Sequence, residues 1–167
     1  GQSVSLRHES TSAHFMAHPS ALAFGAPGLM ATIHEEDTRT QGAEGTPPDF
    51  MGPTLWTSDP ALFDGGDASH ADMLHNSPNG TGIAWESANV YWVFDGYHSS
   101  IVRYDFVEPH ELGGTFHGDG IIQRWVDGEV GYVEGCVSHL AFDPASSLLY
   151  VADSGNNRIM RLDTSTG

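Results

Sequence analysis

The stretch that decides the fold lies near the C-terminus and reads Leu148-Leu-Tyr-Val-Ala-Asp153, then Ser-Gly-Asn-Asn157, then Arg158-Ile-Met-Arg-Leu-Asp163. Two short apolar or alternating runs flank four turn-forming residues, which is the pattern of an antiparallel strand pair. A third run, 138–143, precedes them and is separated from them by the turn residues Pro-Ala-Ser-Ser. The three runs together predict a β-meander.

The same pattern occurs 58 residues earlier in the chain. The offset is kept at three pairs of positions: Asp95 and Asp153, Arg103 and Arg161, and Asp105 and Asp163. A fainter third copy has its first two strands at 19–24 and 28–33. The outer strands are predicted between the copies, at 52–56 and 120–125. A single offset kept over three segments indicates a structural repeat rather than chance similarity.

Four short strands per repeat are typical of a β-propeller blade. The segment Val151-Ala-Asp-Ser-Gly-Asn-Asn-Arg-Ile159 resembles the signature of the NHL-repeat family. The resemblance implies an all-β fold built from about three blades of four antiparallel strands. It places an N-terminal extension at 1–13 and a partial propeller at 14–167, with blades at about 14–68, 69–130 and an incomplete 131–167. Propellers close with four to eight blades, so we expect a six-bladed ring completed by further sequence or by a second chain.

The charge balance restricts the classes of partner. The chain has 22 acidic residues, six Lys plus Arg and a formal net charge of −16. Nucleic acids and anionic membranes attract positive patches, so neither is an expected partner. The acidity suits a cation, a cationic ligand or a saline environment, or it serves solubility alone. No apolar run approaches the length of a membrane span, and we expect a secreted or periplasmic protein.

Ten histidines are the main candidates for chemistry, and the lone Cys136 excludes a cysteine-rich zinc site. Successive strands of a blade alternate in direction, so the lead-in to the first strand and the turn after the second lie at one face. Five histidines occupy such places: His18, His34, His75, His98 and His139. The lead-ins 12–20 and 69–77 also share a Met-x-His pattern with an earlier histidine, His14 in one and His70 in the other.

Convergent imidazoles predict a divalent-metal site at the channel mouth, held mainly by His18, His75, His98 and His139. Imidazole suits zinc or copper, while the neighbouring acids at 35–37 make calcium an alternative. His110 and His117 lie between the third and fourth strands, which predicts the opposite face and a separate metal site. The alternative for all of these histidines is a structural or solvated role. Asp95 and Asp153 are expected to cap the turns that follow them.

The resemblance leaves several functions open. NHL-like propellers include protein-interaction and RNA-binding members, and also the peptidyl-hydroxyglycine amidating lyase, in which histidines from several blades hold a metal. The acidity argues against the RNA-binding branch. We expect metal binding at the channel face, with the site used either to bind a small-molecule ligand or for lyase or hydrolase chemistry through a metal-bound water. No catalytic motif matches residue by residue. The alternatives are a scaffold that binds a protein or glycan at the channel face or at the loops in 35–72, and a pH-responsive histidine surface.

Overall fold

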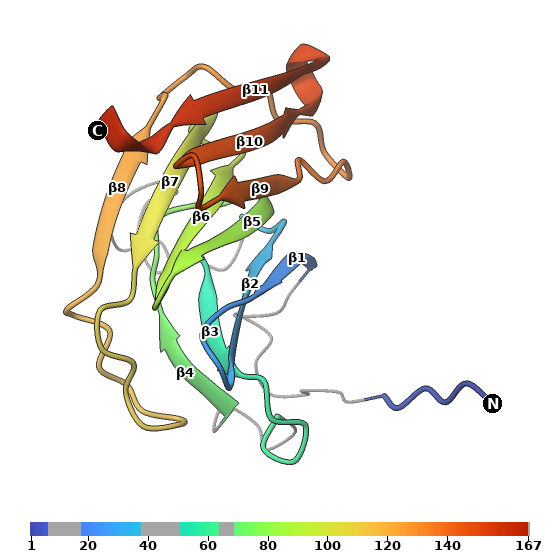
Figure 1. Cartoon of the computed structure of the whole chain (residues 1–167), viewed down its shortest axis with the longest axis vertical. Helices are drawn as coiled ribbons and strands as arrows, with labels where there is room; N and C mark the ends of the chain where they lie inside the picture. Colours follow the sequence, from blue (N-terminus) through green and yellow to red (C-terminus); the bar gives the residue numbers. More distant parts are fainter. Residues whose placement is uncertain (7–17, 38–50, 64–68, 167) are drawn as a thin grey trace.

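The computed structural model describes residues 1–6, 18–37, 51–63 and 69–166, and it contains three antiparallel β-sheets arranged side by side (Figure 1). The first sheet has four strands in chain order: β1 (Pro19–Phe24), β2 (Leu29–His34), β3 (Thr54–Thr57) and β4 (His70–Met73). Helical structure in the described residues amounts to short 3-10 turns such as η2 (Ser154–Asn156) and η3 (Thr164–Thr166). No helix in these ranges is long and apolar enough to cross a bilayer. The prediction of an all-β chain is confirmed.

The other two sheets have the same meander order. The second comprises β5 (Gly80–Ser87), β6 (Val90–Asp95), β7 (Ser100–Asp105) and β8 (Ile121–Trp125). The third comprises β9 (Leu140–Asp143), β10 (Leu148–Asp153) and β11 (Arg158–Asp163). Each strand pairs with the next along the chain, as short turns between antiparallel neighbours require.

Residues that are 58 positions apart have the same pairing register in the second and third sheets. Trp92 pairs with Arg103 across β6 and β7, and Tyr150 pairs with Arg161 across β10 and β11. A slip of one residue would turn every side chain of a strand to the other face of its sheet. Equivalent residues in the second and third sheets therefore point to equivalent faces.

The strands of the first sheet differ from those predicted. The strand predicted at 52–56 as the outer one is the third strand, β3, and the outermost strand is β4. His70–Met73 is instead predicted as part of the loop that leads into the second repeat. The four residues His-Ala-Asp-Met lack the β-branched and aromatic residues that mark a strand. All four are buried, so tertiary packing rather than local propensity makes this segment a strand.

The core consists of two apolar layers, one on each face of the second sheet. Alternate residues of β6 point to opposite faces. Tyr91 and Val93 join the cluster that includes Ile33 of the first sheet, whereas Trp92 and Phe94 join the cluster that includes Leu149 of the third. All four β6 side chains are fully buried. The second sheet is thus packed on both sides.

Two buried aspartates end the second strands of their sheets. The Asp95 carboxylate accepts a hydrogen bond from the backbone N–H of His98 at 3.0 Å, which is the predicted turn cap. Asp153 makes no such cap to the turn that follows it. Its carboxylate accepts instead from the N–H of Gly131 and from Nε of Arg158, both at 2.7 Å. Burial would raise the pKa of Asp153, but these hydrogen bonds outweigh it and hold the pKa below its ordinary value.

We expect Asp153→Asn to destabilise the fold, because Asn keeps the shape but loses the charge that Arg158 and Gly131 contact. Hydrogen bonds to a charged group contribute about 1.5–3 kcal/mol, and a loss of this size should appear in urea unfolding at neutral pH. The contribution is full above the unfolded pKa, near the ordinary value of 3.8, and is lost as pH falls through the lower folded pKa. The exposed Asp127→Asn is the control. Equal stability of the two variants at neutral pH would contradict this role.

Candidate functional site

Three histidines gather at the outer edge between the first two sheets. His70 belongs to β4, and His110 and His117 belong to the loop between β7 and β8, which runs beside β4 (Figure 1). One ring nitrogen from each lies within 4.8 Å of the other two. The ring centroids are 4.9 Å apart for His70 and His110, and 5.1 Å apart for His110 and His117. We call these residues the three-histidine cluster.

Glycines allow the β7–β8 loop to approach β4 closely. The N–H of Gly113 donates to the carbonyl oxygen of His70 at 2.9 Å, which fixes the loop across the strand. A Cβ atom at Gly114 would lie 2.7 Å from Nδ1 of His110, and one at Gly120 would lie 2.2 Å from the side chain of Leu74. A side chain at Gly114 would displace the His110 ring within the loop, and one at Gly120 would push the loop away from Leu74, the residue that follows β4. The loop sequence therefore serves to place His110 and His117 beside His70.

The cluster is shielded from water. His70 is buried and the other two histidines are half-buried. The Nε2 atoms of His110 and His117 are buried and have no hydrogen-bond partner among the described residues. Such atoms lose hydration without compensation, which costs free energy unless a ligand satisfies them.

Electrostatics keep at least one imidazole neutral. Burial, together with repulsion from His110, His70 and His75, lowers the pKa of His117 to about 4. Neutral imidazole is the form that ligates a metal. His75 lies next to the cluster, with its ring centroid 6.3 Å from that of His117.

A buried acid lies on the same strand as His70. Burial raises the pKa of Asp72 to about 7, a shift that the N–H of Met73 opposes and the charge of Asp119 increases. Asp72 Oδ2 and Asp119 Oδ1 are buried without a hydrogen-bond partner among the described residues. A cation in this region would relieve both the desolvation and the repulsion of the two acids. Asp72 is two residues from His70 on β4, and Asp119 is two residues from His117 in the β7–β8 loop.

The geometry suits a small transition-metal ion. Zinc binds histidine nitrogens at about 2.0–2.1 Å, so ligand atoms around it lie roughly 3.3 Å apart. Nitrogen atoms within 4.8 Å of one another are close enough for one ion to be shared among the three rings, provided that binding draws the rings together. Among the residues that the structure describes, this is the group of His, Cys, Asp or Glu side chains close enough together to hold a metal.

The five histidines predicted at the channel face do not form such a group. His18 is exposed, with Nδ1 3.3 Å from the carbonyl oxygen of Glu35, and His34 is buried at the end of β2. His98 Nδ1 lies 2.8 Å from Asp95 Oδ2, while His139 is exposed just before β9. His75 belongs to the surroundings of the three-histidine cluster. His14 lies outside the described residues.

Two members of the three-histidine cluster are predicted together from the sequence, and the third is predicted elsewhere. His110 and His117 are predicted together as a site on the opposite face, which agrees with their proximity in the structure. His70 is predicted at the channel face, because the strand that carries it is not recognisable from its residues. Pairing of β4 with β3 places His70 at the outer edge of the first sheet, and the Gly113 hydrogen bond holds the loop that carries His110 and His117 beside it.

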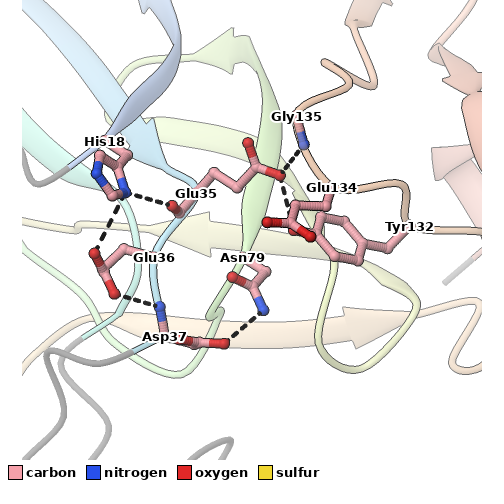
Figure 2. Close-up of a pocket in the computed structure, with 8 residues that line it drawn as sticks. All are labelled: His18, Glu35, Glu36, Asp37, Asn79, Tyr132, Glu134 and Gly135. Carbon is pink, nitrogen blue, oxygen red and sulfur yellow. Dashed lines mark hydrogen bonds and ion pairs between the residues drawn. The ribbon is translucent and has the colours of Figure 1, made fainter.

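A different feature, an acidic cavity of about 480 Å³, lies at the ends of the strands opposite the three-histidine cluster (Figure 2). It lies where the chain enters β1, leaves β2 and enters β5, beside the loop between β8 and β9. Four carboxylates and four other residues line it: Glu35, Glu36, Asp37, Glu134, His18, Asn79, Tyr132 and Gly135. The acids at 35–37 are noted in the sequence as candidate calcium ligands, and the two distant segments join only in the fold.

Glu35 holds the wall of the acidic cavity together. Its carboxylate accepts from the hydroxyl of Tyr132 and from the N–H of Gly135, both at 2.7 Å (Figure 2). Burial, the hydrogen bond to Glu35 and the surrounding negative charges raise the pKa of Tyr132, so the phenol stays protonated and donates. Asn79 Nδ2 donates to Asp37 at 3.3 Å on the opposite wall.

Comparison with known proteins supports the fold but gives no family. No protein-family model matches the chain, and no curated protein matches it. A solved structure described as an auxiliary nutrient binding protein from Bacteroides ovatus superposes with a TM-score of 0.53 and 19% sequence identity. The match covers 89% of this chain and 29% of that one, so this chain spans less than a third of its length. At this identity the likeness concerns the fold alone.

We expect Glu35→Ala to free the segment around Gly135. The Gly135 amide should exchange with solvent about tenfold faster or more, because it loses a hydrogen bond to a charged acceptor. Amide exchange followed by nuclear magnetic resonance measures this. Glu134→Ala, in the same loop, is the control and should leave the rate unchanged. Equal exchange in both variants would show that Glu35 does not fix this wall.

Proposed function

We propose that the protein binds one divalent transition metal, zinc or copper, through His70, His110 and His117. The observation that carries this proposal is the meeting of three ring nitrogens within 4.8 Å, two of them on half-buried histidines. Imidazole is a preferred ligand of both metals. The lowered pKa of His117 supports binding at neutral pH, since no proton has to leave that ring.

The surroundings of the cluster supply candidates for further ligands. His75 interacts electrostatically with His117, and Asp72 is two residues from His70 on the same strand. Three histidines with one coordination position left for water or a substrate atom are typical of catalytic zinc sites, whereas a fourth protein ligand is typical of structural ones. Lyase or hydrolase chemistry remains a prediction from the sequence, as does a secreted or periplasmic location.

We also propose that the three sheets are blades of an NHL-type β-propeller. Three observations support this interpretation: the meander order of each sheet, the register kept over 58 residues, and the contacts that β5 makes with β1 on one side and β9 on the other. In a propeller the first strands of the blades line the axis. The three-histidine cluster would then lie at the rim between two blades, and the acidic cavity at one face.

Metal content and ligand substitutions test the proposed site. Purified protein incubated with zinc, then freed of unbound ion, should retain one zinc per chain by elemental analysis. Even the loss of a residue that supports a ligand costs about 10- to 100-fold in metal affinity, so His70→Ala, His110→Ala and His117→Ala should each weaken binding at least as much. Cobalt in place of zinc should report a histidine-bound ion by its visible absorption.

The matched controls are His18→Ala and His139→Ala, which remove exposed histidines at the predicted channel face. Both should retain full uptake. Loss of uptake in these two variants, with normal binding in the cluster variants, would move the site to the channel face. No uptake of zinc, cobalt or copper by the unmodified protein would refute the proposal. Urea unfolding of every variant separates a lost ligand from a lost fold.

A second candidate function is binding of a small polar ligand in the acidic cavity. Its 480 Å³ volume is within the range of small-molecule sites, and the structural neighbour is described as a nutrient binding protein. Carboxylates and a phenol suit ligands rich in hydroxyl or amino groups. A panel of oligosaccharides and polyamines tested by calorimetry should include a binder whose affinity falls in Asp37→Asn. No binding by any member of the panel would remove this candidate.

A further inference from the structure

The first and third sheets each present an apolar outer face that the described residues leave uncovered. On the third sheet, Ile159 is 75% exposed and Tyr150 is 40% exposed. On the first sheet, Leu22 is 57% exposed and Phe24 is 67% exposed. Clusters of large apolar side chains on an otherwise strongly acidic chain mark an interaction surface.

The outer face of the third sheet repeats a face that is buried in the second sheet. Residues 58 apart in the two sheets share the same register. Three pairs matter here: Trp92 and Tyr150, Phe94 and Ala152, and Ile101 and Ile159. In the second sheet all three members are buried in the cluster shared with the third sheet. The second sheet uses these positions to pack against the third sheet. In the third sheet the same positions are uncovered by the described residues.

The outer face of the first sheet repeats the complementary face. Strand pairing makes Leu22, Ile83 and Leu140 equivalent, because they pair with Thr32, Val93 and Val151 respectively. Ile83 and Leu140 are buried against the sheet that precedes their own. Leu22 has the same place in the first sheet. Beside it lies a groove of about 500 Å³, lined by residues of β1 and β2, such as Met30, and by Phe63 from the turn after β3.

We propose that two copies of this chain associate head to tail, the outer face of the third sheet of each copy packing on the outer face of the first sheet of the other. A two-fold axis then produces two identical interfaces and a closed ring of six sheets. The two interfaces between sheets inside the chain indicate which partner fits. A second copy offers a first-sheet face for the uncovered third sheet and a third-sheet face for the uncovered first sheet. The pairing does not depend on the proposed metal site.

The net charge of −16 sets a salt dependence for this association. Two copies repel each other at low ionic strength, and salt screens that repulsion. The apolar contact itself is not weakened by moderate salt. Dimerisation is therefore stronger at high than at low ionic strength, opposite to the behaviour of an interface held by ion pairs.

Sedimentation velocity of the unmodified chain tests the association over a wide range of concentration and at two salt concentrations. The expected result is a species of twice the chain mass, favoured by concentration and by salt. Ile159→Glu and Phe24→Glu each place a charge in one of the two faces, and each alone should give a monomer. Val4→Glu, at an exposed apolar residue far from both faces in the sequence, is the control and should remain a dimer.

Mixing the two face variants distinguishes head-to-tail packing from other arrangements. An Ile159→Glu copy keeps its first-sheet face intact, and a Phe24→Glu copy keeps its third-sheet face intact. The mixture should therefore form a dimer through one restored interface, although neither variant does so alone. A monomeric unmodified chain under all conditions would overturn the proposal, and so would dimers unaffected by both substitutions. Circular dichroism confirms that each variant is folded.

Discussion

The two-sided burial of β6 is the constraint on which the rest of the structure depends. Because Tyr91 and Val93 pack toward the first sheet while Trp92 and Phe94 pack toward the third, the strand has no solvent face. A strand of this kind needs a sheet on each side, and each added sheet exposes a new apolar face. The repeat in the chain follows from this physical requirement, because each sheet buries one face of its neighbour and exposes one face of its own.

Polar groups inside such a stack have to be satisfied locally. Asp95 and Asp153 occupy equivalent positions, yet they are satisfied by different partners: His98 and Arg124 for the former, Gly131 and Arg158 for the latter. The end of the second strand needs a hydrogen-bond acceptor in both sheets, and the aspartate provides it. The residues that donate to this aspartate differ with the turn that follows. The buried charge of Asp153 thus joins the segment before β9, through Gly131, to β10 and, through Arg158, to β11.

The two candidate sites use different chemistry at opposite ends of the strands. At the three-histidine cluster, the buried Nε2 atoms of His110 and His117 have no hydrogen-bond partner among the described residues, which favours a bound ion. At the other end of the strands, the carboxylates of the acidic cavity reach solvent or are hydrogen-bonded within the protein. Glu35, for example, accepts hydrogen bonds from Tyr132 and Gly135. An interior-like environment increases electrostatic interactions, which is why the histidine-rich rim, rather than the more acidic cavity, is the better candidate for a bound metal.

The sequence by itself determined the all-β class, the repeat and most of the strands, because alternation, turn residues and a constant offset are local signals. It also paired His110 with His117, which are close together along the chain. Only the tertiary structure decided that His70 joins them, since β4 is a four-residue outer strand without a local strand signal and is ordered by the loop that packs across it. The same holds for the acidic cavity, where Glu35 meets a loop about a hundred residues away. Contacts at that separation depend on how the sheets stack, which no local pattern in the chain records.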